Sequence, residues 1–146
     1  MPLTRIWSQG IRDYDRWHKR QTIALAEHLL EHEHIPEDRH EDGIAAKFLN
    51  TYMHQLMKYG APRYLYTRLH LTLDQKILDH LKRMRWPEAA AINNLLKKSP
   101  YKMAYSEYAK IQSAIAGFIE GKNTQLPRRM TIDSRVELNW LWAVDR

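Results

Sequence analysis

The chain contains no cysteine, which excludes disulfide bonds, thiolate zinc sites and cysteine nucleophiles together. Glycine and proline are also scarce, with 5 and 6 copies in 146 residues. A turn-rich β-sandwich needs many of both, whereas residues that lose little rotamer freedom in helices, such as Ala, Leu, Lys and Glu, are abundant. The composition therefore predicts an all-α protein, a single domain over residues 1–146 folded as an orthogonal bundle of about six helices.

Long apolar runs are missing as well. No segment approaches the roughly 20 apolar residues that a membrane helix needs, and the first residues lack the apolar core of a signal peptide. We therefore expect a soluble, cytoplasmic protein that makes no membrane contact. No motif indicates a cofactor or an oligomeric state, so none is predicted.

Charge is the most unequal property of the chain. Lys and Arg number 23 against 17 Asp and Glu, which gives a formal net charge of +6 and a pI near 9.6. Acidic residues concentrate in residues 27–42, and basic residues gather in residues 58–85 and again at Lys97, Lys98, Lys102, Arg128 and Arg129. This separation favours one polarised face that binds a polyanion. We expect the partner to be nucleic acid, with DNA ahead of RNA.

One pair of histidines has the spacing of metal ligands. His28 and His32 lie one helical turn apart, beside Glu27 and Glu31. No third ligand follows at a matching spacing. We therefore interpret these residues as a solvated polar face and predict no metal site.

The first expected helix is long and opens at Asp13 or Asp15, because either carboxylate can accept hydrogen bonds from free backbone amides. It ends before Pro36. Its expected apolar stripe consists of Trp17, Ile23, Ala24, Leu25, Leu29 and Leu30.

The second expected helix covers residues 43–59, with Asp42 as its N-cap. Lys47 and Lys58 lie on its polar side together with Thr51 and His54. Its expected core face consists of Ala45, Phe48, Leu49, Tyr52, Met53, Leu56 and Met57.

Later helices are marked by caps and breakers. Thr72 and Gln75 have the form of a capping box, so a helix should begin there and direct Ile77, Leu78 and Leu81 inward. Another helix should begin at Pro87 and end before Pro100. A further helix is expected over residues 101–120, with Met103, Tyr108, Ile111, Ile115, Ala116 and Phe118 inward and Gly121 as terminator. The tail from residue 133, with its dense tryptophans, should form a docked C-terminal helix.

Cations alternate with aromatic residues between the second and third expected helices, where Gly60 and Pro62 break the helix. Basic groups interleaved with aromatic rings suit phosphate contacts combined with base stacking. The alternative is that the tyrosines pack beneath the loop and the arginines only solvate it. The predicted nucleic-acid contacts are Lys58, Tyr59, Arg63, Tyr64, Tyr66, Arg68 and His70.

Two segments resemble a known enzyme family. Lys47-Phe-Leu-Asn-Thr-Tyr-Met-His-Gln-Leu-Met57, followed by His70-Leu-Thr-Leu-Asp-Gln-Lys-Ile-Leu78, is similar to the lysine-bearing helix and the later aspartate segment of helix-hairpin-helix DNA glycosylases, most nearly the archaeal 8-oxoguanine type. The resemblance implies that Lys47 attacks the sugar of a flipped nucleotide and that Asp74 assists loss of the base. The implied activity is base excision with AP lyase chemistry, as in DNA repair. Only Gly43 lies near the place where that family has a glycine hairpin.

A second enzyme hypothesis rests on Arg63 and His70, which are separated by six residues. This spacing resembles the Arg-x4–6-His element of helical HEPN ribonucleases, and Arg12 with His18 matches it too. The third hypothesis is a non-catalytic basic module that binds nucleic acid or a protein partner through residues 58–68. It asks no chemistry of Lys47 or Asp74.

Overall fold

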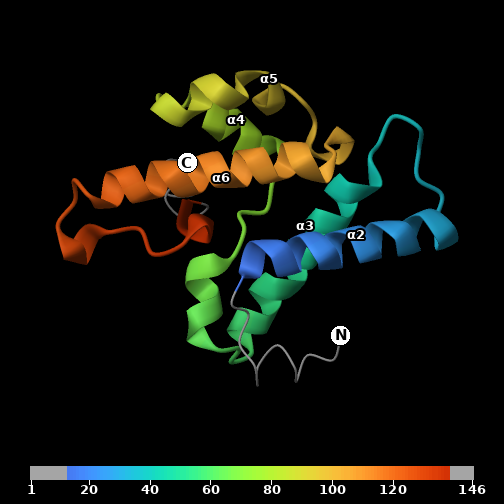
Figure 1. The fold of residues 1–146 in the computed structure, drawn as a ribbon, viewed down its shortest axis with the longest axis horizontal. Coiled ribbons are helices and arrows are strands. Elements are labelled where there is room, and N and C mark those ends of the chain that lie inside the picture. Colours follow the sequence, from blue (N-terminus) through green and yellow to red (C-terminus); the bar gives the residue numbers. More distant parts are fainter. Residues whose placement is uncertain (1–12, 139–146) are drawn as a thin grey trace.

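The computed structural model describes residues 13–138, and these residues contain helices but no β-strand (Figure 1). This confirms the predicted all-α class. None of the described helices is both long and apolar enough to span a bilayer. The elements are α2 (Tyr14–His32), α3 (Glu41–Lys58), η1 (Arg63–Arg68), α4 (Gln75–Arg83), η2 (Pro87–Ile92), α5 (Asn93–Leu96), η3 (Pro100–Lys102), α6 (Tyr105–Asn123), η4 (Arg128–Met130) and η5 (Arg135–Glu137), where η denotes a 3-10 helix.

Helix α6 runs across the middle of the molecule, with α4 and α5 on one side and α2, α3 and η1 on the other (Figure 1). Each side has its own hydrophobic cluster. The larger cluster joins α6 to α4, η2 and α5, and contains among others Leu78, Leu81, Trp86, Ile111 and Ile115. The smaller cluster joins α2, α3, η1 and η5, and contains Tyr14, Trp17, Met53, Leu65, Leu69 and Val136.

Helix α2 begins where the sequence predicts, because the Asp13 carboxylate accepts a hydrogen bond of 3.0 Å from the backbone amide of Arg16. The predicted apolar stripe is wrong in part. Ile23 and Leu30 are 37% and 54% exposed. The buried face is instead the one that carries Tyr14, Trp17, His18, Thr22 and Ala26, where two polar residues occupy core positions.

Helix α3 begins one residue earlier than its predicted cap. His40 is the N-cap, and its Nδ1 accepts a hydrogen bond from the backbone amide of Asp42. The Asp42 carboxylate instead accepts a 2.9 Å hydrogen bond from the amide of Tyr105 in the first turn of α6. The prediction that Asp42 caps its own helix is therefore wrong, because a residue distant in sequence supplies the amide that it binds.

The core face of α3 also differs from the prediction. Phe48 is 59% exposed and Tyr52 is 43% exposed. The face toward α2 and α6 carries small or polar residues, which are Gly43, Ala45, Ala46 and Asn50, followed by Met53. Helices can approach closely along such a face.

Gly43 marks the closest of these approaches. A Cβ atom at this position would lie 2.2 Å from the carbonyl oxygen of Pro100 in η3. Glycine is required here for packing and not for an unusual backbone angle. Gly60 has the opposite role: its φ of 89° ends α3, and the amide of Ala61 then bonds the carbonyl of Leu56.

Helix α4 begins at Gln75, and its N-cap is Asp74. The prediction that Thr72 caps this helix is wrong because residues 71 and 73 are leucines that are buried, which holds the preceding chain extended. The predicted inward residues Ile77, Leu78 and Leu81 are all buried, as expected.

Helix α6 is displaced relative to its prediction. It begins at Tyr105 and continues to Asn123, so Gly121 lies inside the helix and does not end it. Gly121 lacks the positive φ of a glycine that ends a helix, which Gly60 alone has among the described glycines. Met103, Tyr108, Ile111 and Ile115 are buried as predicted, whereas Ala116 is exposed and Phe118 is partly buried.

Part of the predicted C-terminal helix is visible as η5, which carries the buried Val136, followed by buried Leu138. The tryptophans of this tail, Trp140 and Trp142, lie outside the described residues.

Candidate functional site

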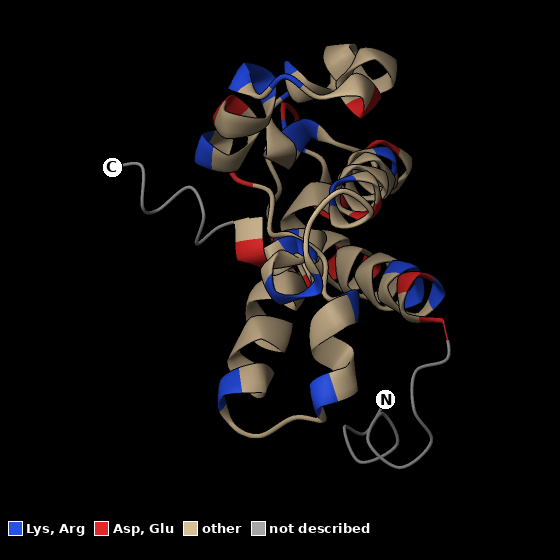
Figure 2. Ribbon diagram, turned by 90° about the vertical axis from the view of Figure 1, so that its left-hand side faces the viewer, with Lys and Arg blue, Asp and Glu red and all other residues tan. Residues whose placement is uncertain are grey.

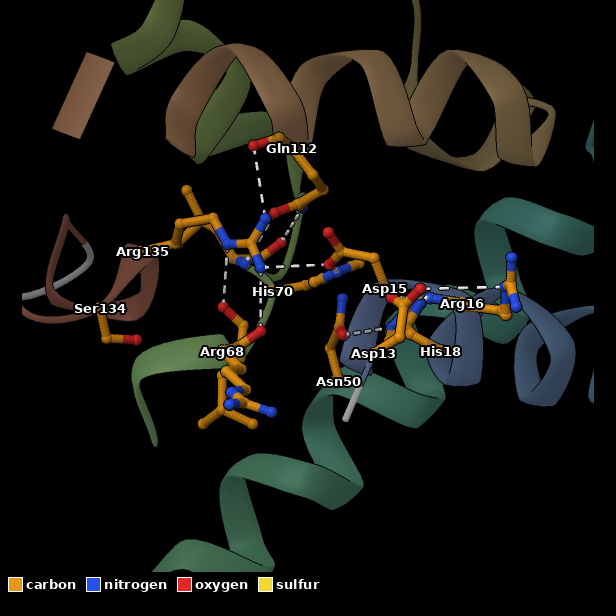
Figure 3. A network of polar contacts seen from close by, with 12 residues as sticks. Asp13, Asp15, Arg16, His18, Asn50, Arg68, His70, Gln112, Ser134 and Arg135 are labelled. Atoms are coloured by element: carbon orange, nitrogen blue, oxygen red, sulfur yellow. Dashed lines mark hydrogen bonds and ion pairs between the residues drawn. The ribbon is translucent and has the colours of Figure 1, made fainter. Parts of the chain in front are cut away.

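A chain of buried polar groups runs between the two hydrophobic clusters (Figure 3). At its centre is the Asn50 side chain of α3. Its Oδ1 lies 2.8 Å from Nε2 of His18, and its Nδ2 donates to the hydroxyl of Tyr108 at 2.8 Å. These side chains come from three different helices. They are 0 to 3% exposed, so each polar atom depends on a partner inside the protein.

This network of side-chain hydrogen bonds continues on both sides of Asn50. On one side, Nδ1 of His18 lies 2.9 Å from the hydroxyl of Tyr105. On the other, the Tyr108 hydroxyl lies 2.9 Å from Nδ1 of His70. The two imidazole rings are also neighbours, with centroids 4.0 Å apart.

The hydrogen bonds of this network can be assigned donors and acceptors in one consistent order. The amide nitrogen of Asn50 can only donate, so the Tyr108 oxygen accepts from it and the Tyr108 hydroxyl proton goes to Nδ1 of His70. His70 then carries its proton on Nε2 and donates it to Oδ1 of Asp15 at 2.7 Å. The network thus assigns the amide orientation of Asn50 and the tautomers of His18 and His70. The Asp15 carboxylate is its anionic end.

Arg135 completes the anionic end. Its guanidinium lies 3.5 Å from Oδ1 of Asp15 and donates to the backbone carbonyls of Leu69 and Arg68 at 3.1 and 2.9 Å. Gln112 fixes Leu71, two residues further along the same extended segment, because its side-chain amide bonds both the N–H and the C=O of Leu71. The extended chain before α4 is therefore held by side chains from α6 and η5 (Figure 3).

The environment shifts the pKa values of these groups. The hydrogen bond from His70 holds the pKa of Asp15 at about 2. Burial lowers the pKa of His70 to about 4, although Asp15 opposes this effect, and burial also lowers the pKa of His18. Both imidazoles are consequently neutral at pH 7. A carboxylate with so low a pKa is a poor general base, so this network favours structure over acid–base catalysis.

The predicted catalytic residues have other partners. Lys47 Nζ donates to the hydroxyl of Tyr101 at 2.6 Å and lies 5.0 Å from the centroid of that ring. Asp74 caps α4 by accepting from the amide of Ile77 at 2.8 Å. Within residues 13–138 no hydrogen bond or ion pair joins Lys47 to Asp74, and neither lines the cavities described below. Their catalytic roles stay predictions.

The predicted nucleic-acid contacts are separated by the structure into two groups. Lys58, Arg63 and Arg68 are exposed, Tyr59 is 86% exposed and Tyr64 is 37% exposed. Tyr66 is partly buried, and its pKa is raised to about 12 by burial and by Glu137, to which its hydroxyl donates.

His70 is the other case, at 2% exposed with both ring nitrogens engaged by Asp15 and Tyr108. His70 is therefore buried, whereas Arg63 is exposed. The ribonuclease hypothesis would need these two residues at one phosphodiester. Arg12, the other arginine with this spacing, lies outside the described residues.

The potential metal ligands have structural roles as well. The rings of His28 and His32 are neighbours on the exposed side of α2, with centroids 4.4 Å apart and planes tilted by 49°. In the described part of the chain, His40, Glu41 and Asp42 bring their ligand atoms within 4.8 Å of one another. His40 caps α3 and Asp42 caps α6, so both groups already have the partners that their helix ends require.

Three cavities lie near the polar network and the predicted nucleic-acid contacts. One of about 380 Å³ is lined by Asp15, His70, Tyr105 and Arg135, and one of about 670 Å³ adjoins it on the side of Tyr14. A third, of about 680 Å³, lies between α3, η1 and η5 and is lined in part by Lys58, Arg63 and Tyr66. Each cavity includes at least one residue predicted to contact nucleic acid, and the third includes three of them, Lys58, Arg63 and Tyr66.

No protein-family model, curated protein or solved structure matches this chain. The resemblance to glycosylases therefore rests on the quoted segments alone, and function has to be argued from the side chains.

The buried polar network was not predicted from the sequence. Hydrophobic periodicity was the signal for the helices, and it ignores polar residues on a core face. A signal was present in α2, where His18 and Thr22 follow Tyr14 at intervals of four residues, which places them on the buried side. The partners of His18 could not be found this way, because Tyr105 lies 87 residues further along the chain.

Proposed function

We propose that this protein is a non-catalytic nucleic-acid-binding module whose contact surface is the exposed basic and aromatic segment from α3 to η1. This basic tyrosine surface consists of Lys58, Tyr59, Arg63, Tyr64 and Arg68. The observation that carries the proposal is that all five side chains are exposed. No acidic residue occurs between Asp42 and Asp74 in the sequence, so the segment itself carries only positive charge.

The arrangement in space supports the same proposal. Figure 2 shows Lys and Arg on both sides of the loop that joins α3 to η1, at one end of the molecule. Cations placed in this way can follow a phosphate backbone, and each phosphate that is neutralised releases counterions. The tyrosines supply faces on which bases can stack. Arg68 lies 5.8 Å from the centroid of the Tyr64 ring, which combines a cation and a stacking face.

The test is a titration of labelled DNA and RNA, single-stranded and duplex, at salt concentrations from about 50 to about 200 mM. We expect affinity to fall steeply with salt. Arg63→Gln and Arg68→Gln should each weaken binding and reduce the salt slope by about one. Arg85→Gln is the matched control, because Arg85 is equally exposed but follows α4, on the other side of α6 (Figure 1).

Equal losses from Arg85→Gln and Arg63→Gln would show a general charge effect and contradict the proposed surface. Borohydride trapping on duplexes that contain 8-oxoguanine or an abasic site separates binding from lyase chemistry. Our proposal predicts no covalent adduct. An adduct with the wild type that disappears in Lys47→Gln would establish the Schiff-base mechanism instead.

A further inference from the structure

The third cavity adjoins the basic tyrosine surface and extends it into the protein. Its lining includes the apolar side chains of Met57, Leu69 and Val136, and the charged residues Lys58, Arg63, Asp133 and Glu137 also line it. The volume of about 680 Å³ falls inside the roughly 300 to 1,000 Å³ typical of small-molecule pockets. The apolar side chains and the two cations of this lining suit a flat apolar ring attached to an anionic group.

Polar groups in this cavity are positioned by the fold. Nε2 of His54 lies 3.3 Å from the carbonyl oxygen of His70, so Nε2 carries the proton and donates it. Burial lowers the pKa of His54, which leaves Nδ1 as an acceptor at neutral pH. Thr72 and Gln55 contribute further polar atoms to the lining. An acceptor and neutral polar groups beside apolar side chains are what the edge of a nucleobase requires.

Two acidic residues, Asp133 and Glu137, also line the cavity, and the Glu137 carboxylate has partners within the protein. The Glu137 carboxylate accepts from the amides of Asp133 and Ser134 at 2.6 and 2.9 Å. It also accepts from the Tyr66 hydroxyl, which fixes the orientation of that ring beside the cavity. The Glu137 charge is thus held by donors from the protein, whereas the side chains of Asp133, Lys58 and Arg63 are exposed.

We infer that this cavity receives one unstacked base of a single-stranded nucleic acid whose phosphates lie on the basic tyrosine surface. The inference rests on the proposed function and adds a preference to it. In a duplex the base would first have to leave its stack and its pair, which costs free energy, whereas a single strand presents it directly. The protein should therefore bind single strands more tightly than duplexes.

The experiment measures fluorescence anisotropy with a single strand and a duplex of equal length and sequence. We expect the wild type to bind the single strand about tenfold more tightly. Thr51→Trp places a large side chain at the exposed edge of the cavity and should remove this preference, while salt-dependent duplex binding is kept. Gln125→Trp adds the same side chain at an exposed position outside the cavity lining and should change neither affinity.

The outcomes separate the two proposals. Equal affinity of the wild type for both forms, with the loss in Arg63→Gln retained, would overturn the base pocket and leave the binding module standing. Absence of all binding would overturn both. A free mononucleotide, followed through the NMR signals of the Leu69 and Val136 methyl groups, supplies the second arm. If it shifts these signals while single strands bind no better than duplexes, the cavity is a free-nucleotide site and the strand proposal is wrong.

Discussion

The Asp15 carboxylate accepts a 2.7 Å hydrogen bond from Nε2 of His70, a residue 55 positions further along the chain. The Asp15 side chain is 72% exposed and that of His70 is 2% exposed, so this contact joins the surface to the core. It sets the tautomer of His70, and through Tyr108 it orients the amide of Asn50. One exposed charge thereby orders a line of buried neutral groups.

Stability should fall in mild acid. The unfolded chain takes up a proton on His70 near pH 6.5, but the folded protein does so only near pH 4, where its pKa lies. Between these values the unfolded state binds more protons, so stability decreases as the pH falls. The expected loss from His70 is about 3 kcal/mol, and His18 acts in the same direction. Urea unfolding from about pH 7 to about pH 4.5 measures this loss.

His70→Gln should flatten that pH dependence, whereas His28→Gln, at an exposed position of α2, should leave it unchanged. Stability that stays constant over this pH range in the wild type would contradict burial of a neutral His70. Asp15 affects the pH dependence only below about pH 4, because its pKa is lowered to about 2 and its contribution to stability, present at higher pH, is lost as the pH falls from about 4 to about 2.

Asn50→Leu should destabilise the protein by about 3 kcal/mol. Leucine has a similar size but can neither accept from His18 nor donate to Tyr108, so buried polar atoms would lose their partners. Asn94→Leu is the control, because Asn94 is exposed in α5, and it should stay within about 0.5 kcal/mol. Equal effects of the two substitutions in urea unfolding would show that the network adds nothing to stability.

Gly43→Ala and Gly121→Ala should have opposite signs. Both glycines lie in α-helices, where alanine is intrinsically favoured by up to about 1 kcal/mol. At Gly121 a Cβ meets nothing within 4 Å, so alanine should stabilise. At Gly43 the Cβ would collide with the Pro100 carbonyl, so α3 and η3 must separate, with a loss of about 1 to 3 kcal/mol. Thermal unfolding of both variants tests the pair, and a stabilising Gly43→Ala would refute the close approach.

Asp74→Ala should cost about 1 kcal/mol of stability, while Asp74→Asn should cost little, because asparagine also caps helices well. The structural role needs an oxygen that accepts from the Ile77 amide and does not need a charge. If Asp74→Asn proved as damaging as alanine in urea unfolding, capping alone would not explain the residue. A loss of trapping in a stable Asp74→Asn would support the chemistry implied by the glycosylase resemblance.

Several features of the fold follow from local sequence and were predicted from it. The start of α2 at Asp13, the start of η2 at Pro87 and the inward face of α4 all depend on interactions within a few residues. The break in the helix within the basic segment was also predicted from the sequence, because Gly60 and Pro62 interrupt a helix.

The errors share a different cause. Phe48 was expected inside and is exposed, while Asn50, two residues away, is buried. Asp42 was expected to cap its own helix and caps α6. Tyr108, which Asn50 contacts, and Tyr105, whose amide Asp42 binds, each lie more than 50 residues away in sequence. Local hydrophobic periodicity contains no information about such distant partners.

The sequence by itself determined that this chain is helical and basic, because helix propensity, caps and charge are properties of short segments. Only the tertiary structure decided which polar residues enter the core, because burial of His18, Asn50 and His70 is favourable only when donors and acceptors from α2, α3 and α6 meet with matching geometry. It also decided that the basic segment lies beside a cavity, since residues of α3, η1 and η5 form that cavity only after the chain has folded.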